Sequence, residues 1–300
     1  MKYLKYLKYF LIAWFILTLL ICLGGIIKYN IEVNSYISKK EPEVTIHPSD
    51  SINSKTEVYV VGTVHYETEK LKRDSFYNYI HKISPSLILY ESDSLIVRRM
   101  TKRIDFINQL MSAFKKENKV ESFVSLRYLK HHPEAQVLSY EWEERDAFHR
   151  THNYNSFSSK MIGALLNSYR QNVLTSEQSA VMKKYSELNT EYFKIGRNAK
   201  VIYDLNNDRA DSITRERQFY HYKLIPEIIR ERPELEAYKD FVPLHMQYWD
   251  TRNKAMAANI LFHIKRNPNK KIVVLTGKTH RYYLIDELKK YQEDLNFSVE

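Results

Sequence analysis

Cysteine and glycine are both scarce in this sequence. A single cysteine, Cys22, occurs among 300 residues, and it lies inside an apolar run near the N-terminus. The chain therefore forms no internal disulfide, and the rest of the sequence offers no thiolate metal site and no cysteine nucleophile. Six glycines and eight prolines, with no run of Pro, Gly or Ser, argue against a disordered or linker-rich protein. There is also no internal repeat of a solenoid period.

Acidic residues are absent from residues 1–28, which contain four lysines, Lys2, Lys5, Lys8 and Lys28. These lysines supply +4 of the net charge of +10, so the remaining 272 residues carry +6. Basic and acidic residues are interspersed over that remainder, which is typical of a solvated surface rather than a nucleic-acid groove. We therefore expect no nucleic-acid partner. A mildly basic surface also suits the neighbourhood of anionic lipid headgroups.

An uncharged run of about 19 residues extends from residue 9 to residue 27, long enough to cross a hydrocarbon core of roughly 30 Å. Three lysines precede this run, and positive charge favours the cytoplasmic side of a membrane. We therefore predict a single-pass protein with a cytoplasmic N-terminus. Everything after the run is then extracytoplasmic, as in a protein of the bacterial cell envelope.

Two alternatives to a permanent anchor are a cleaved signal peptide and a lipoprotein. A signal peptide has an apolar region of 7–15 residues and an Ala-x-Ala cleavage site, and the sequence shows neither. A lipoprotein requires a small residue just before the modified cysteine, whereas Leu20 and Ile21 precede Cys22. We therefore predict an anchor over residues 1–30, a polar tether over residues 31–55 and a folded domain over residues 56–300.

The start of the domain has the pattern of a βαβ unit. Short β-branched and aromatic runs at residues 58–61 and 87–90 predict two buried strands. Between them, residues 70–83 have the apolar spacing of a helix, which Pro85 ends. A helix between two strands of one sheet makes those strands parallel.

Three further strands are predicted at residues 137–140, 271–276 and 296–299, the last at an edge of the sheet. Residues 95–130 and most of the segment from about 145 to 265 have helical patterns. A helix is expected from residue 283 onwards. The predicted fold is an α/β domain with a mostly parallel central sheet, helices packed on it and a large helical insertion, preceded by one transmembrane helix.

Two predicted strands, far apart in the sequence, end in the same Gly-x-x-His pattern. Residues 62–65 end in His65, and residues 277–280 end in His280. Glu91 and Glu141 follow two other predicted strands. Ligands bind beyond the carboxyl ends of parallel strands, so we expect these four side chains to converge at one edge of the sheet. Two His and two Glu suit either a divalent-metal site or an acid–base pair.

Each of these residues also has a structural interpretation. A His at a strand end is often a turn residue with its hydrogen bonds satisfied, and a Glu there often caps the next helix, as Glu141 would. Arg252 lies at the start of an amphipathic helix that leads into the strand at residues 271–276. It is either a surface residue or a further member of the same sheet edge.

Four segments together resemble the TraB/PrgY/TIKI family, which belongs to a wider group with the ChaN haem-binding and erythromycin esterase-like proteins. They are Val-Val-Gly-Thr-Val-His, Pro-Ser-Leu-Ile-Leu-Tyr-Glu-Ser-Asp, Thr-Arg-Asn-Lys-Ala-Met-Ala and Val-Val-Leu-Thr-Gly-Lys-Thr-His. The resemblance covers about residues 57–290, although about residues 100–245 match only in helical content. Family members often have Gly after the last motif, where this chain has Arg281.

The resemblance implies a metal-dependent hydrolase that acts on a peptide or an ester. His65, Glu91 and His280 would hold a divalent metal ion, whose bound water has a lowered pKa. A second carboxylate, Glu141 or Glu69, would accept the proton of that water. Arg252 would stabilise the developing oxyanion.

Three other possibilities remain open at this point. In a metal-free hydrolase, His65 and Glu91 would act together as a general base. In a binding module, the same residues would hold haem or sequester a peptide without catalysis. In a scaffold, both histidines would be structural.

Overall fold

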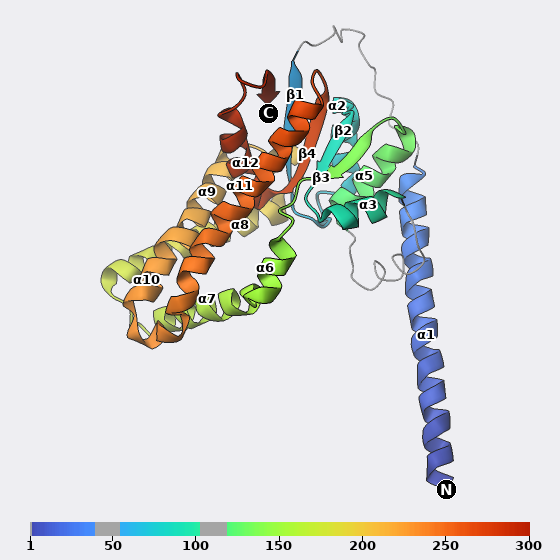
Figure 1. Cartoon of the computed structure of the whole chain (residues 1–300). Coiled ribbons are helices and arrows are strands. Elements are labelled where there is room, and N and C mark those ends of the chain that lie inside the picture. The colour runs from blue at the N-terminus through green and yellow to red at the C-terminus, as the bar shows by residue number, and fades with distance from the viewer. Residues whose placement is uncertain (1, 40–54, 103–118) are drawn as a thin grey trace.

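The computed structural model describes residues 2–39, 55–102 and 119–300, and its centre is a five-stranded sheet (Figure 1). The strand order is β3-β2-β4-β1-β5, and every pairing in this sheet is parallel. Helices surround the sheet, as the sequence predicts. The strands are β1 (Thr56–Thr63), β2 (Leu87–Tyr90), β3 (Gln136–Ser139), β4 (Lys271–Gly277) and β5 (Phe297–Val299).

The described helices fall into an N-terminal helix, helices that flank the sheet and a helical insertion between β3 and β4. The first two groups are α1 (Lys2–Ile37), α2 (Arg73–Ile83), α3 (Ser94–Lys102), α5 (Val120–His131) and α12 (Lys278–Lys289). The insertion comprises α6 (Arg145–Thr151), α7 (Tyr154–Arg170), α8 (Ser176–Asn198), η1 (Ile202–Asp204), α9 (Asp208–Phe219), the π-helix η2 (Tyr220–Leu224), α10 (Ile225–Glu231), η3 (Pro233–Phe241) and α11 (Val242–Arg266).

The sheet is buried on both faces, which explains the nearly continuous apolar runs of its strands. Ile88 and Val273 on one face pack in a core with α2 and α5. Leu89 and Val274 on the other face pack in a core with α11 and α12. The helical insertion has a third core of its own, centred on α7, α10 and α11.

The register of the strands brings their carboxyl ends to one edge of the sheet. Thr63 of β1 is paired with Gly277 of β4, and Tyr90 of β2 is paired with Leu275. Residues that directly follow β1, β2 and β4 therefore lie side by side. This edge is where the sequence predicts a functional site.

Two boundaries differ from the predictions. Helix α12 begins at Lys278 rather than at residue 283, so His280 lies in the first turn of a helix and not in a loop. Helix α1 continues past the apolar run to Ile37, so residues 31–37 are helical and not part of a polar tether. Most of the predicted tether, residues 40–54, lies outside the described residues.

The N-terminal helix contains a segment, Tyr9–Lys28, that is long and apolar enough to cross a membrane. Apolar side chains such as Phe15 and Ile21 are exposed all around this segment. The C-terminal end of α1, in contrast, packs against α5, where Tyr36 is buried. The helix is therefore attached to the α/β domain at one end.

Candidate functional site

His65 and Glu121 form a hydrogen-bonded pair at the carboxyl end of β1. The His65 Nδ1 atom lies 2.7 Å from Glu121 Oε1 on α5, and the Thr63 hydroxyl donates to the same oxygen. Glu121 is buried, whereas the His65 side chain is 36% exposed. Because Nδ1 donates its hydrogen bond to the carboxylate, the Nε2 atom of the neutral His65 ring carries the free lone pair.

The backbone at His65 adopts a left-handed conformation, with φ of 64°. Such values are uncommon for residues other than glycine and often occur at functional sites. Two hydrogen bonds hold the turn: the Val120 amide donates to the His65 carbonyl at 2.7 Å, and the Tyr66 amide donates to the Val64 carbonyl at 2.8 Å. The turn directs the imidazole back across the sheet edge towards Gly277.

Gly277 leaves room for the His65 ring. A Cβ atom at this position would lie 2.9 Å from His65 Nε2 and 3.6 Å from Glu91 Oε2. Only a residue without a side chain fits between the imidazole and the carboxylate. The two Gly-x-x-His turns are therefore in contact, as the sequence predicts, but through Gly277 rather than through the two histidines.

The pKa values of this pair are shifted in opposite directions. Burial would lower the pKa of His65, but the hydrogen bond and the charge of Glu121 outweigh it and raise the pKa above its usual value. Burial would raise the pKa of Glu121, but the interactions with His65 and Thr63 lower it overall. Glu121 is therefore a carboxylate that orients His65 and stabilises its protonated form.

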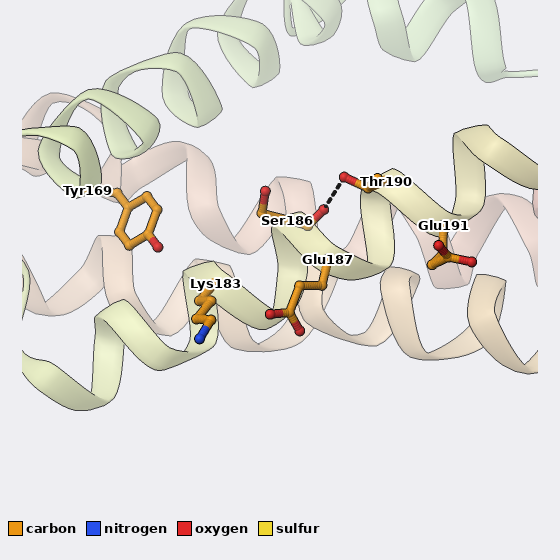
Figure 2. A pocket seen from close by; sticks show the side chains of 6 residues that line it. All are labelled: Tyr169, Lys183, Ser186, Glu187, Thr190 and Glu191. Atoms are coloured by element: carbon orange, nitrogen blue, oxygen red, sulfur yellow. Dashed lines mark hydrogen bonds between the residues drawn. The ribbon is translucent and has the colours of Figure 1, made fainter.

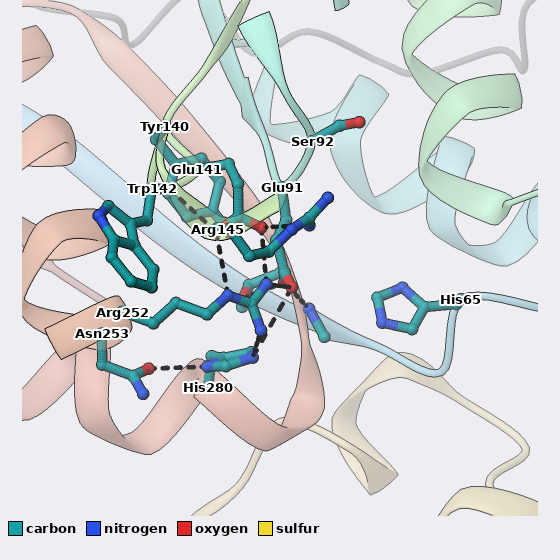
Figure 3. Close-up of polar contacts among 12 residues, drawn as sticks. His65, Glu91, Ser92, Tyr140, Glu141, Trp142, Arg145, Arg252, Asn253 and His280 are labelled. Atoms are coloured by element: carbon teal, nitrogen blue, oxygen red, sulfur yellow. Dashed lines mark hydrogen bonds and ion pairs between the residues drawn. The ribbon is translucent and has the colours of Figure 1, made fainter. Parts of the chain in front are cut away.

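Glu91 follows β2 and is buried at the centre of the edge (Figure 3). Its Oε2 atom accepts hydrogen bonds from the Gly277 amide at 2.6 Å and the Thr276 hydroxyl at 2.9 Å. Its Oε1 atom accepts one from Arg252 at 2.8 Å. Burial would raise the pKa of Glu91, but His280, Arg252 and the amide outweigh it and keep the pKa well below its usual range.

Arg252, from α11, joins both carboxylates to His280. Its guanidinium donates to Glu141 Oε1 at 3.0 Å, Glu141 Oε2 at 2.6 Å, Glu91 Oε1 at 2.8 Å and His280 Nε2 at 3.0 Å (Figure 3). These bonds occupy four of its five N–H groups. Arg252 therefore holds the residues of this edge together. Only one of its N–H groups remains for an oxyanion, so it does not fit the predicted role of oxyanion stabiliser.

His280 is buried and fully engaged. Its Nδ1 atom donates to Asn253 Oδ1 at 2.7 Å, its Nε2 atom accepts from Arg252, and its ring stacks on Trp249 with 4.8 Å between centroids. Burial first and then the positive charge of Arg252 lower the pKa of His280 to about 4. It is a neutral histidine at neutral pH, buried in the domain with both ring nitrogens bonded.

Both carboxylate oxygens of Glu141 likewise accept hydrogen bonds from neighbouring groups. Besides Arg252, it accepts hydrogen bonds from the Trp142 amide at 2.9 Å and from Arg145 at 2.8 Å. Burial would raise its pKa, but Arg252 outweighs it and lowers the pKa below the usual value. Glu141 therefore does not fit the predicted role of a proton acceptor, and it is not the N-cap of α6, which is Glu144. Glu69, the other proposed acceptor, is exposed in the loop before α2.

The predicted metal ligands do not assemble into a metal site. His65, Glu91 and His280 all lie at the expected edge, but no group of three such side chains that could hold a metal ion occurs among the described residues. The guanidinium of Arg252 lies between Glu91 and His280, where a metal ion would meet both donors. Its positive charge repels a second cation. The residues present therefore do not fit this ligand set, which corrects the prediction.

A pocket of about 290 Å³ opens beside His65. It is lined by the loop after β1, by the C-terminal half of α8 and by the start of α12. Its volume is at the small end of the range for ligand sites, about 300–1,000 Å³. Its walls combine aromatic and basic side chains: Tyr66, Tyr192, Phe193, Arg197 and Lys278.

Lys278 is the second titratable group in this pocket. Its Nζ atom donates to the Tyr192 carbonyl at 2.9 Å and lies over the ring of the same residue. Its aliphatic chain passes Gly196, where a Cβ atom would lie 3.3 Å from Lys278 Cε. Burial lowers the pKa of Lys278 to about 6, with a smaller contribution from Arg217. Its pKa therefore lies close to neutral pH, and its side chain forms part of the lining of the pocket.

A different hollow, on α8, lacks these features. It is lined by Tyr169, Lys183, Ser186, Glu187, Thr190 and Glu191, and its marked hydrogen bond joins the Thr190 hydroxyl to the Ser186 carbonyl one turn earlier (Figure 2). None of the predicted site residues lines it. The chemistry at the sheet edge is therefore concentrated in the pocket beside His65.

Sequence reasoning missed Glu121 and Lys278. Glu121 lies in the first turn of α5, in a segment whose apolar spacing predicts only a helix. No short-range pattern connects it to His65, 56 residues earlier. Lys278 lies inside the second Gly-x-x-His motif, and its burial follows from the contact with α8, which the sequence does not reveal.

Comparisons with known proteins give one distant similarity. No family model and no curated protein matches this chain. A solved structure of a mutant of the erythromycin esterase EreC, in its open conformation, is similar with 12% identity and a TM-score of 0.34. The match covers 75% of this chain and 61% of that one, so the chain spans less than two thirds of the length of the protein it matches. At this level, the similarity assigns no activity.

Proposed function

We propose that this chain is a membrane-anchored hydrolase in which His65, oriented by Glu121, activates a water molecule. The observation that carries the proposal is the 2.7 Å contact between His65 Nδ1 and Glu121 Oε1, which leaves Nε2 free beside a pocket. A base oriented in this way by a carboxylate is a recurrent element of hydrolytic sites.

The proposed reaction is the attack of water on a carbonyl group. Water in the pocket gives a proton to His65 Nε2 as its oxygen adds to the carbonyl carbon. The carboxylate of Glu121 stabilises the imidazolium that forms. The protonated His65 then returns this proton to the leaving group, an alcohol from an ester or an amine from a peptide.

Lys278 is proposed to bind the carbonyl oxygen of the substrate. It lines the same pocket as His65, and its bond to the Tyr192 carbonyl uses one N–H group, which leaves at least one for a ligand. Donors that are already positioned where negative charge develops stabilise a transition state strongly. Glu91, Arg252, Asn253 and His280 form the rigid support beneath the site.

This proposal needs no metal ion among the residues that carry the reaction. Metal dependence, the expectation from the sequence, depends on His65, Glu91 and His280 as ligands, and Arg252 lies between the last two. Hydrolysis that persists after exhaustive treatment with EDTA supports the proposal. Activity that disappears with EDTA and returns with one added metal supports the metal-dependent alternative.

The direct test measures hydrolysis of fluorogenic esters and peptides by the purified full-length chain in detergent. We expect His65→Ala to lower the rate at least 100-fold, as is typical for the loss of a general base. The matched control is His152→Ala, which removes an exposed imidazole from the insertion. Equal rates for wild type and His65→Ala would refute the proposal. A Soret band in the purified protein, without hydrolysis, would favour a haem-binding module.

A further inference from the structure

The C-terminal end of the anchor helix is in direct contact with the α/β domain. Tyr36, in the last turn of α1, is 4% exposed and packs edge-on against Phe123 of α5, with 5.8 Å between ring centroids. The guanidinium groups of Arg73 and Arg127 each lie 5.2 Å from the Tyr36 ring centroid. Just beyond the helix, Lys39 pairs with Asp74 at 2.6 Å. We call this contact the anchor dock.

The anchor dock lies close to the membrane surface. The candidate span ends at Lys28, and α1 continues without a break to Ile37. Eight residues of helix separate Lys28 from Tyr36, which corresponds to about 12 Å at 1.5 Å per residue. A continuous helix of this length fixes both the height and the tilt of whatever is docked on it.

The anchor dock and the His65 site share the same elements. Glu121, which orients His65, lies two residues before Phe123 in α5. Arg73 lies at the other end of the loop that starts at His65, and it bonds Glu67 within that loop at 2.9 Å. The site is therefore positioned relative to the anchor by a few direct contacts.

The carboxyl edge of the sheet lies on the side of the domain where the candidate span is. The carboxyl ends of the strands point in the direction in which α1 runs towards its N-terminus, and the helical insertion extends to the same side (Figure 1). The pocket is lined by residues that follow β1 and β4, so it lies at this end of the sheet.

The mouth of the pocket has the composition of a membrane-surface site. Tyr66 and Phe193, which line it, are 55% and 49% exposed. Arg197 is exposed in the same lining, and Lys194 is exposed next to Phe193. Aromatic rings beside basic groups suit the boundary between anionic headgroups and acyl chains.

We propose that the substrate is an acyl ester of an anionic membrane lipid, taken from the leaflet next to the anchor dock. This inference rests on the proposed function and names its substrate class. The reaction consumes one water molecule and releases a fatty acid and an alcohol. Arg197 and Lys194 bind the headgroup, the aromatic rings contact the acyl chain, and His65 acts on the ester between them.

The test compares two substrates of the full-length chain reconstituted in vesicles of phosphatidylcholine and phosphatidylglycerol. One is a fluorogenic phosphatidylglycerol ester within the vesicles, and the other is a short, water-soluble fluorogenic ester. The test variant carries seven helix-forming residues inserted after Ile31, about two helical turns, which raises the domain by about 11 Å and preserves its direction. We expect hydrolysis of the lipid ester to fall at least 10-fold and hydrolysis of the soluble ester to stay within twofold.

The matched control carries the same seven residues after Asp50, which lies in the sequence between Lys39 and the dock residues of the α/β domain, and we expect it to hydrolyse both substrates at the wild-type rate. Equal lipid hydrolysis by both insertion variants overturns the inference. So does hydrolysis of the soluble ester, or of a peptide, without hydrolysis of the lipid. Wild-type protein that hydrolyses no substrate refutes the proposed function itself, so the two failures are distinguishable.

Discussion

At the scale of single residues, Arg252 determines what the carboxyl edge of the sheet can do chemically. One guanidinium pairs with two buried carboxylates and donates to a neutral histidine. Burial would lower its pKa, but Glu91 and Glu141 outweigh it and raise the pKa well above its usual value. The same residue types that suit a metal site thus form a closed network around a permanent positive charge. Among the histidines and carboxylates discussed, the nitrogen with an unshared lone pair is Nε2 of His65.

The structure changes the prediction for His280→Ala. From the sequence, this substitution is expected to cost under about 1 kcal/mol, because the side chain is predicted to project into solvent. The buried ring instead has both nitrogens bonded. Its loss leaves one N–H group of Arg252 and the Oδ1 atom of Asn253 unpaired and opens a cavity, which costs about 2–4 kcal/mol. We expect the melting temperature to fall by several degrees, measured against His152→Ala, which should leave it unchanged.

At the scale of elements, the positions of the strands could be predicted from the sequence. The side-chain contacts that helices make at the carboxyl edge of the sheet could not. Buried parallel strands are short apolar runs with turn residues at each end, and such runs predict all five strands to within about two residues. The shared Gly-x-x-His turns also predict that the residues after β1 and β4 meet at one edge of the sheet. The pairing of His65 with Glu121 depends instead on how α5 packs against β1. No local pattern encodes that contact.

The start of α12, the helix after β4, is a second feature that the sequence did not predict correctly. An apolar pattern places its start near residue 283, but the helix begins at Lys278 because the Gly277 turn leads directly into it. This shift of one and a half turns moves His280 from a loop into a buried helix face. In this buried position, His280 no longer fits its predicted role as a metal ligand.

The turn at Gly277 yields a direct prediction about the site. Its φ of −58° suits alanine, so Gly277→Ala causes no backbone strain, but the new methyl group would lie 2.9 Å from His65 Nε2. The partly exposed imidazole must move away. We expect the fold to persist and hydrolysis to fall about 10–100-fold, as for other small displacements of a reacting group.

The control for this substitution is Gly163→Ala on α7, where a Cβ atom meets nothing within 4 Å. It replaces a helical glycine with alanine and should raise stability slightly, by about 0.5–1 kcal/mol, at unchanged activity. Normal hydrolysis by Gly277→Ala would show that the position of His65 above this glycine is unimportant for the reaction.

At the scale of the whole molecule, the lysines at the N-terminus predict on which side of a membrane the domain lies. Positive charge favours the cytoplasmic side, so we predict export of residues 31–300 and expect a reporter that is active only in the cytoplasm, fused after Glu300, to remain silent. Replacing Lys2, Lys5 and Lys8 with glutamate in the same fusion should raise the signal. Strong activity of the original fusion would show that the domain lies in the cytoplasm.

The central proposal is that Glu121 makes His65 a general base, and the pH dependence of hydrolysis tests it most directly. The base acts when it is neutral, so activity should disappear as the pH falls through the pKa of His65. Because Glu121 raises this pKa, the acid limb of wild type should have its midpoint above the usual value of about 6.5. Glu121→Gln removes the charge and should move the midpoint to lower pH while lowering the maximal rate. An acid limb that stays in place in Glu121→Gln would contradict the assignment of His65 and Glu121 as the catalytic pair.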